Sequence, residues 1–186
     1  DSPQNQTKNF DAKKFTDLLK ISDSTGSPLS LRDYQLNSIQ DAITSDRKTI
    51  LSVTGSGKSA VIYSLVRYYQ LKGMRILVMV PNISLVNQMF SDFQEYSQLN
   101  QWDTDANIEK IFYGQEPLGK QVTLSTWQSQ LNQNKEHFQK YDVVISDEVQ
   151  LFKGKEVSSI LERLVNARYR FGFTGTLTDA QCDHRL

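Results

Sequence analysis

A Gly-rich octet between an apolar run and an amphipathic stretch constrains this chain more than any other feature. The octet reads Ser-Val-Thr-Gly-Ser-Gly-Lys-Ser over residues 52–59. Residues 49–51 favour a short strand and residues 60–66 favour a helix, which is the context that a phosphate-binding P-loop requires. Glycines at 55 and 57 let backbone N–H groups approach phosphate oxygens where a Cβ would clash. The pattern predicts a nucleotide site at a strand-to-helix turn.

Two side chains of the octet carry its chemistry. Lys58 has the reach for the β- and γ-phosphates, and Ser59 offers a hydroxyl to Mg²⁺. The helix that follows directs its positive N-terminal dipole at the same anion. A Gly/Ser hinge without a ligand is the alternative, but the Lys-Ser pair at the right offset favours the P-loop, although Ser52 replaces the usual opening Gly or Ala. The expected nucleotide contacts are Thr54, Gly55, Ser56, Gly57, Lys58 and Ser59.

Composition limits the other function classes. The 186 residues carry 21 basic and 21 acidic side chains, so bulk charge gives no support for nucleic-acid binding, which needs a local patch. A single cysteine, Cys182, excludes an internal disulfide framework and favours a reducing compartment, the cytoplasm (of the host cell, if a phage encodes the chain). No apolar run approaches the roughly 20 residues of a membrane span, so no membrane partner is expected.

Apolar segments alternate with amphipathic ones along the chain. Runs apolar on both faces, such as residues 76–80 and 143–145, are typical of buried parallel strands with helices on each side. The alternation predicts an α/β fold of three layers, a mainly parallel sheet flanked by helices. Strands are expected at 49–53, 75–80, 108–113, 121–125, 142–146 and 170–174, and helices at 31–44, 58–71, 84–96, 127–132, 135–138 and 157–166.

The N-terminal part has weaker signals. Phe10, Phe15, Leu18 and Leu19 are expected on one face of a short helix, and Ser30 is expected to cap the helix at 31–44. Residues 22–28 resemble a linker. The chain is therefore divided into an N-terminal arm, or a partial accessory segment with a linker, at residues 1–28 and a nucleotide-binding lobe at residues 29–186.

Paired carboxylates follow one of the buried strands. Asp147-Glu148 comes directly after the run Val-Val-Ile-Ser. Downstream of a P-loop, one carboxylate is expected to hold hydrated Mg²⁺ and the other to orient and deprotonate the attacking water. We assign Asp147 to the metal, together with Ser59, and Glu148 to the water; two solvated acids in a turn are the alternative. Lys58, Asp147 and Glu148 are the expected catalytic residues.

Six segments in order resemble the motifs of superfamily 2 helicases, most of all the UvsW-like group of phage recombination and repair helicases. The resemblance covers about residues 31–177, and as an ordered set these motifs are highly specific. It rests on Leu-Arg-Asp-Tyr-Gln at 31–35, the P-loop, Val-Pro-Asn at 80–82, Ser-Thr-Trp-Gln at 125–128, Asp-Glu-Val-Gln at 147–150 and Phe-Thr-Gly-Thr-Leu at 173–177.

The resemblance implies a RecA-like P-loop NTPase lobe that uses ATP and Mg²⁺ and binds DNA, with RNA as the alternative. It implies that Gln35 reads the adenine edge and that Arg32 or Tyr34 packs on the base. Nucleic-acid contacts are implied for Pro81, Asn82, Thr126, Trp127 and Gln128, and coupling between the two sites for Gln150, Thr174, Gly175 and Thr176. Trp127 has an equally good alternative as a core residue, and Thr174 as part of a turn.

Two departures from the family pattern bear on function. Gln150 stands at a position where the family usually has His or Asp. In the family, the residue at this position contacts the partner motor lobe. The family also places ATP between two lobes, the second of which supplies arginine fingers, whereas only ten residues follow Thr176 here. We therefore expect the first motor lobe of an ATP-dependent DNA helicase or branch-processing translocase, with a missing second lobe as its partner and little turnover alone. A kinase-like P-loop phosphotransferase and a non-catalytic nucleic-acid-binding module are the alternatives.

Overall fold

The fold is built on a parallel sheet. A computed structural model describes residues 7–45, 48–52, 57–113, 115–148, 154–163 and 167–174. Within these residues six parallel strands form one sheet in the order β1-β6-β5-β2-β4-β3. The strands are β1 (Lys48–Ser52), β2 (Ile76–Val80), β3 (Ile108–Ile111), β4 (Val122–Thr126), β5 (Val143–Ser146) and β6 (Tyr169–Thr174).

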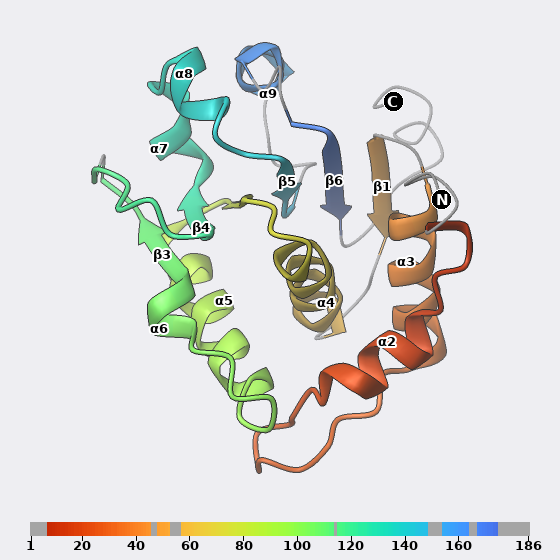
Figure 1. The fold of residues 1–186 in the computed structure, drawn as a ribbon. Coiled ribbons are helices and arrows are strands. Elements are labelled where there is room, and N and C mark those ends of the chain that lie inside the picture. Colours follow the sequence, from red (N-terminus) through yellow and green to blue (C-terminus); the bar gives the residue numbers. More distant parts are fainter. Residues whose placement is uncertain are drawn as a thin grey trace.

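Helices cover both faces of this sheet (Figure 1). Along β2, Ile76, Val78 and Val80 enter one apolar core, while Leu77 and Met79 enter a second core on the opposite face. Helices α2 to α5 pack into the first core, and α7 to α9 into the second. The helices are α2 (Ala12–Leu19), α3 (Asp33–Thr44), α4 (Lys58–Leu71), α5 (Ile83–Tyr96), α6 (Thr104–Asn107), α7 (Trp127–Leu131), α8 (Lys135–Phe138) and α9 (Gly154–Arg163).

The predicted three-layer α/β fold is confirmed, because a strand that is apolar on both faces needs helices on each side to cover it. All six predicted strands and all six predicted main helices are present, most of them with ends shifted by one to three residues. Helix α9 begins three residues earlier than predicted, at Gly154. Helix α6 was not predicted; Asp103 caps it by accepting a hydrogen bond from the Ala106 N–H.

The start of α3 corrects one prediction. The helix begins at Asp33, so Arg32 and not Ser30 is its N-cap residue. The physical reason is that Gln35 reaches back and accepts a hydrogen bond from the Arg32 backbone N–H at 2.8 Å. This satisfies one of the backbone groups that the helix start leaves open and makes a serine at the cap unnecessary.

The N-terminal segment packs on the lobe. Ala12, Leu19 and Ile21 belong to the same core as the helices of the first face. Leu18 does not share this face, in contrast to the prediction, because it is 78% exposed. The proposed boundary between an arm at residues 1–28 and a lobe at 29–186 stays a prediction. No helix in the described ranges is long and apolar enough to cross a membrane.

A buried polar chain links α8, α7 and β4. His137 Nε2 lies 2.9 Å from Gln130 Oε1, and Gln130 Nε2 donates to Ser125 Oγ at 2.7 Å. Because the Gln130 amide nitrogen is used as a donor, its oxygen faces His137 and accepts from the ring N–H. Burial lowers the pKa of His137 below its usual value of 6.5, with Lys140 and Arg75 acting in the same direction.

We expect His137 to make the stability of the fold pH-dependent. Since its folded pKa is depressed, the unfolded chain takes up the proton first as the pH falls below 6.5. The His137 contribution is therefore present above pH 6.5 and is lost as the pH falls through the folded pKa. In His137→Gln, which keeps a donor for Gln130 but does not titrate, the unfolding free energy should fall less between about pH 7.5 and about pH 5. Urea unfolding at several pH values measures this; parallel profiles of the two proteins would contradict it.

Candidate functional site: a nucleotide-binding pocket

The predicted nucleotide residues meet at the carboxyl edge of the sheet. In the register of β1 and β6, Ser52 lies opposite Thr174, and β5 ends beside β6 at Ser146. Because these strands are parallel, Ser52 at the end of β1 and the pair Asp147-Glu148 after β5 lie at the same edge of the sheet. The sequence predicts these segments at one edge because each follows the end of a parallel strand, and the strand register confirms this prediction for the described residues.

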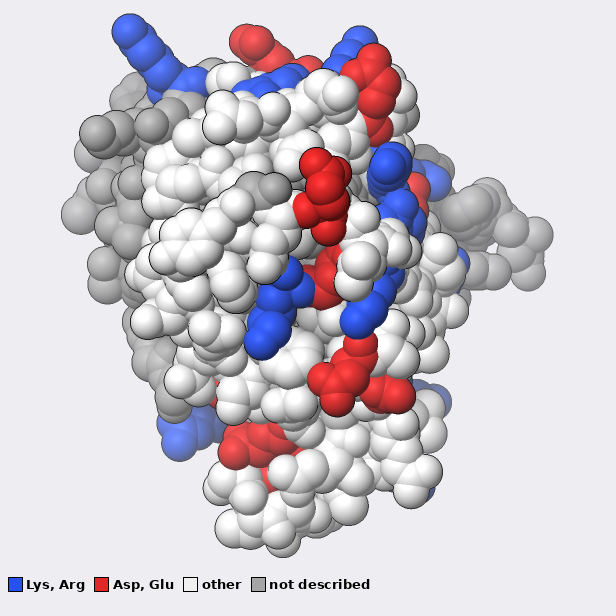
Figure 2. All heavy atoms as spheres, turned by 90° about the vertical axis from the view of Figure 1, so that its left-hand side faces the viewer, with Lys and Arg blue, Asp and Glu red and all other residues white. Residues whose placement is uncertain are grey.

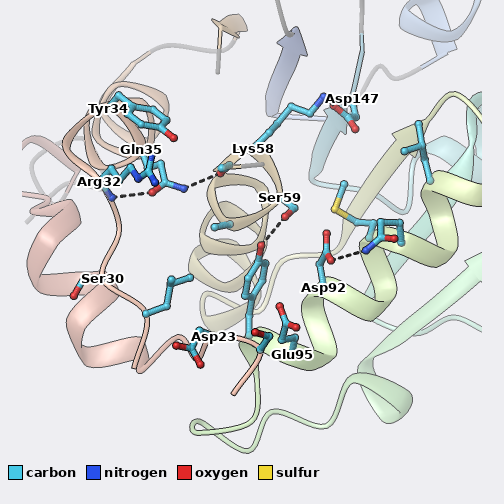
Figure 3. A pocket seen from close by; sticks show the side chains of 18 of the residues that line it. Asp23, Ser30, Arg32, Tyr34, Gln35, Lys58, Ser59, Asp92, Glu95 and Asp147 are labelled. Atoms are coloured by element: carbon cyan, nitrogen blue, oxygen red, sulfur yellow. Dashed lines mark hydrogen bonds and ion pairs between the residues drawn. The ribbon is translucent and has the colours of Figure 1, made fainter. Parts of the chain in front are cut away.

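Lys58 joins the P-loop to the carboxylates. Its Nζ lies 2.8 Å from Asp147 Oδ1 and also pairs with Glu148 Oε1. Figure 3 shows the side chain extending from the first turn of α4 toward Asp147 at the end of β5. Asp147 is only 2% exposed, so its carboxylate is held in a nearly dry environment. The three residues predicted to be catalytic are therefore in direct contact.

The charges at this contact are set by burial and by each other. Burial raises the pKa of Asp147, and Lys58 opposes this shift without cancelling it. Desolvation works against the charge of Lys58, but its interactions with Asp147 and Glu148 together raise the pKa of Lys58 above 10.5. Lys58 is consequently a fixed cation at neutral pH. It is held by two anions that a nucleotide phosphate can replace.

The backbone turns sharply where the carboxylates leave the sheet. Glu148 has a φ of 55°, in the left-handed region that few non-glycine residues adopt. The preceding residue is anchored, since the Asp147 N–H donates to the Met79 carbonyl at 2.8 Å. Such a conformation costs about 1 kcal/mol or more and is found most often at functional sites. Here the left-handed turn occurs at the residue whose side chain pairs with Lys58.

Gln35 connects α3 to the end of the P-loop. Its Nε2 donates to the Gly57 carbonyl at 3.0 Å, and its Oε1 accepts from the Arg32 N–H. A Cβ on Gly57 would lie 2.7 Å from Gln35 Nε2 and 2.9 Å from the Tyr34 hydroxyl, so a side chain there would displace the ends of these two side chains. An amide has two N–H groups and two lone pairs, which leaves Gln35 one of each for the predicted adenine edge.

Ser59 has a partner that the sequence did not indicate. Its Oγ lies 2.6 Å from the hydroxyl of Tyr96, the last residue of α5. The two residues are 37 positions apart. In the sequence Tyr96 is one of several apolar residues on the inner face of a helix, and no spacing rule marks its hydroxyl.

These groups surround one cavity of about 680 Å³. That volume lies within the usual range for small-molecule sites. Figure 3 shows its walls, which come from the start of α3, the first turn of α4, one side of α5 and the segment before α3. Arg32, Tyr34, Gln35, Lys58, Ser59, Asp147 and Glu148 line it, with Asp23, Asp92, Glu95 and Tyr96 on the α5 side.

The donor set fits Mg²⁺. In the part of the chain that the structure describes, no group of three or more His, Cys, Asp or Glu side chains forms a metal cage. Mg²⁺ is commonly held by one or two protein oxygens, by water and by phosphates, and the cavity offers the Ser59 hydroxyl and the Asp147 carboxylate. Asp147 Oδ1 is buried and ion-paired with Lys58 without an aligned hydrogen bond, so it keeps lone pairs for a cation.

The residues implied in nucleic-acid contacts lie at neighbouring strand ends. Val80 pairs with Thr126, so Pro81 and Asn82 after β2 lie beside Trp127 after β4. Gln128 follows in the same short helix, α7. The side chains of Asn82 and Thr126 cap the helices that begin there, accepting from Leu85 N and Ser129 N. Trp127 is partly buried and packs against the second core, which supports its structural role; base stacking stays a prediction.

Several predicted residues cannot be placed. Thr54, Gly55 and Ser56 of the P-loop lie outside the described residues, as do Gln150, Gly175 and Thr176. Thr174 is described and is fully buried at the end of β6, opposite Ser52. It therefore stands next to the strand that leads into the P-loop, which is where a residue coupling nucleotide and nucleic-acid sites is expected.

Comparison with known proteins identifies the family of this chain. The family model described as "Type III restriction enzyme, res subunit" matches residues 28–179. The ATP-dependent DNA helicase uvsW of Enterobacteria phage T4 is 32% identical over 157 residues, which are 81% of this chain and 30% of that protein. The DNA 3'-5' translocase XPB2 of Sulfurisphaera tokodaii is 30% identical over 158 residues, 85% of this chain and 33% of that one. The chain thus spans about a third of the length of these relatives.

Solved structures agree in fold. The crystal structure of the UvsW helicase from bacteriophage T4 superposes with a TM-score of 0.79 and 28% identity, over 94% of this chain and 64% of that one. A SWI2/SNF2 ATPase core from Sulfolobus solfataricus, in complex with double-stranded DNA, reaches a TM-score of 0.67 at 15% identity over 88% of this chain and 34% of that one, and so shows the fold alone. The chain belongs to the family of the type III restriction enzyme res subunit, and it is a RecA-like N-terminal lobe of the superfamily 2 helicase type.

Proposed function

We propose that this chain is the ATP-binding motor lobe of a DNA helicase or branch-processing translocase that acts in recombination and repair. The observation that carries the proposal is the contact of Lys58 with Asp147 and Glu148 inside the cavity. It unites the P-loop cation with the carboxylates that nucleotide hydrolysis needs. The relatives named above, an ATP-dependent DNA helicase and a DNA translocase, support the same substrate class.

Each group has a role that follows from its position. Lys58 exchanges its carboxylate partners for the β- and γ-phosphates, which offer it stronger anionic acceptors. Asp147 and Ser59 hold Mg²⁺, which neutralises phosphate charge when it is bound. Glu148, released from Lys58, orients the attacking water and accepts its proton. Gln35 presents its remaining N–H and lone pair to adenine, with Arg32 beside the base.

DNA is proposed to lie along the strand ends that carry Asn82 and Thr126. Figure 2 shows the face beside β3 and α6, where Lys and Arg side chains are interspersed with Asp and Glu. A DNA backbone needs a predominantly positive surface, which this mixed face does not offer. Backbone N–H groups at the starts of α5 and α7 offer phosphate contacts that do not depend on net charge.

We further propose that the arginine fingers of the ATPase site belong to a second lobe outside these 186 residues. The described residues form one sheet with its two helical layers, which is one RecA-like lobe. Residues 29–186 are assigned to this lobe and residues 1–28 to an N-terminal arm. The first lobe alone is expected to bind nucleotide and to contact the DNA backbone.

Substitution of the P-loop lysine tests the nucleotide site. Lys58→Ala should weaken Mg-ATP binding by at least about tenfold, because it removes a charge-assisted contact to phosphate. The variant should stay folded, since the raised pKa of Asp147 lets that carboxyl take up a proton once Lys58 is gone. Calorimetry or fluorescent-nucleotide titration measures the affinity. Lys72→Ala, at the opposite end of the same helix, is the matched control. Equal affinity of Lys58→Ala and wild type would refute the assignment.

Turnover by the isolated chain tests the division into lobes. An arginine finger contributes about 10³–10⁵ in rate, so the 186 residues should hydrolyse ATP very slowly, with or without DNA. Steady-state phosphate release with single-stranded and forked DNA measures this. A DNA-stimulated rate comparable to that of a two-lobed helicase would show that the chain carries a complete site.

A further inference from the structure

The hydroxyl of Ser59 is held from the side by α5. Ser59 lies in the first turn of α4, and its Oγ is 2.6 Å from the Tyr96 hydroxyl (Figure 3). Both residues line the cavity, and Tyr96 is only 8% exposed. A buried phenol that meets the metal-binding hydroxyl at this distance fixes the direction in which that hydroxyl points.

Tyr96 is itself held in place from three sides. Its ring packs against Tyr63 on α4, with ring centres 5.3 Å apart. The backbone N–H of Ser22 donates to the Tyr96 carbonyl at 3.1 Å. The next residue, Ser97, hydrogen-bonds to the Tyr63 hydroxyl at 2.8 Å. The Tyr96 hydroxyl is therefore a rigid partner for Ser59.

Tyr96 also stays neutral. The pKa of a tyrosine hydroxyl is ordinarily about 10, well above physiological pH. At physiological pH its hydroxyl consequently keeps its proton. Through its oxygen lone pairs it can still accept a hydrogen bond from a neighbouring hydroxyl.

We propose that Tyr96 is a positioning residue for Mg²⁺ binding. It accepts a hydrogen bond from the Ser59 hydroxyl and so turns the Ser59 lone pairs toward the metal. A serine hydroxyl has one proton and two lone pairs. When the Ser59 O–H donates a hydrogen bond to Tyr96, both lone pairs of the Ser59 oxygen remain for a cation. Since a bound cation makes the Ser59 proton a better donor, the two interactions strengthen each other. The inference rests on the proposed nucleotide-binding function.

Competition between Tyr96 and Mg²⁺ for Ser59 is the alternative, and it predicts a change of the opposite sign in the Mg²⁺ dependence of nucleotide binding. If Tyr96 competed with the metal for Ser59, its removal would strengthen the response of nucleotide binding to Mg²⁺. Positioning requires Ser59 to donate in the 2.6 Å contact, which leaves both of its lone pairs for the metal, whereas competition requires Tyr96 to donate and to occupy one of them. The sign of the effect therefore distinguishes positioning from competition.

The test is the Mg²⁺ dependence of nucleotide binding by Tyr96→Phe. The readout is the ratio of affinities for a fluorescent ATP analogue with and without Mg²⁺, measured on the 186-residue chain. We expect Tyr96→Phe to reduce this ratio about three- to tenfold, the usual worth of one hydrogen bond. An unchanged or increased ratio would overturn the proposal.

Two further variants separate positioning from packing. Tyr141→Phe removes a buried tyrosine hydroxyl that meets Thr123 Oγ at 2.9 Å, and Tyr141 packs in the second core, whereas Tyr96 packs in the first. It should leave the ratio unchanged, and an equal loss in Tyr141→Phe would show that the loss does not depend on the contact of Tyr96 with Ser59. In the Ser59→Ala background, Tyr96→Phe should have no further effect on the ratio, because its route to the metal is already removed.

Failure of the inference and failure of the proposed function look different. If wild type binds the analogue with a clear Mg²⁺ dependence but Tyr96→Phe behaves like wild type, only the role of Tyr96 is refuted. If wild type shows no Mg²⁺-dependent nucleotide binding, the nucleotide site and the role of Tyr96 are both refuted. Thermal unfolding of each variant without nucleotide confirms that the comparison is made between folded proteins.

Discussion

The site depends on the ion pairs of one lysine with two carboxylates. Lys58 begins the helix after the P-loop, and Asp147 and Glu148 end a strand about 90 residues later in the chain. Because Asp147 is buried, its charge is tolerable only with a cation beside it or a proton on it. The contact thus ties the P-loop to the centre of the sheet and keeps both sides ready for phosphate and metal.

The parallel sheet makes this contact possible. Strands β1, β6 and β5 are neighbours, so the segments that leave their carboxyl ends converge even though they are distant in sequence. The same rule places Asn82 and Thr126 at adjacent ends of β2 and β4. Nucleotide residues and candidate nucleic-acid residues consequently share one edge, on neighbouring strands. Coupling between the two sites through these strand ends stays a prediction.

Two elements hold the first turn of α4 from different sides. From α3, Gln35 donates to the Gly57 carbonyl; from α5, Tyr96 meets the Ser59 hydroxyl. A side chain at position 57 would displace the Gln35 amide from this contact. The segment before α3 joins the same assembly, since the Ser22 N–H donates to Tyr96 and the Ser22 hydroxyl to the Glu95 carbonyl. The nucleotide pocket is therefore built by α3, α4, α5 and the N-terminal segment together.

The sequence by itself determined the three layers and the main site residues. Apolar runs such as residues 76–80 identify strands buried on both faces, and Lys58, Asp147 and Gln35 stand in patterns tied to phosphate, metal and base chemistry. Only the tertiary structure decided that Arg32 caps α3 and that Tyr96 meets Ser59. Periodicity reports which face of a helix is apolar, but a contact between single atoms 37 residues apart depends on how two helices pack.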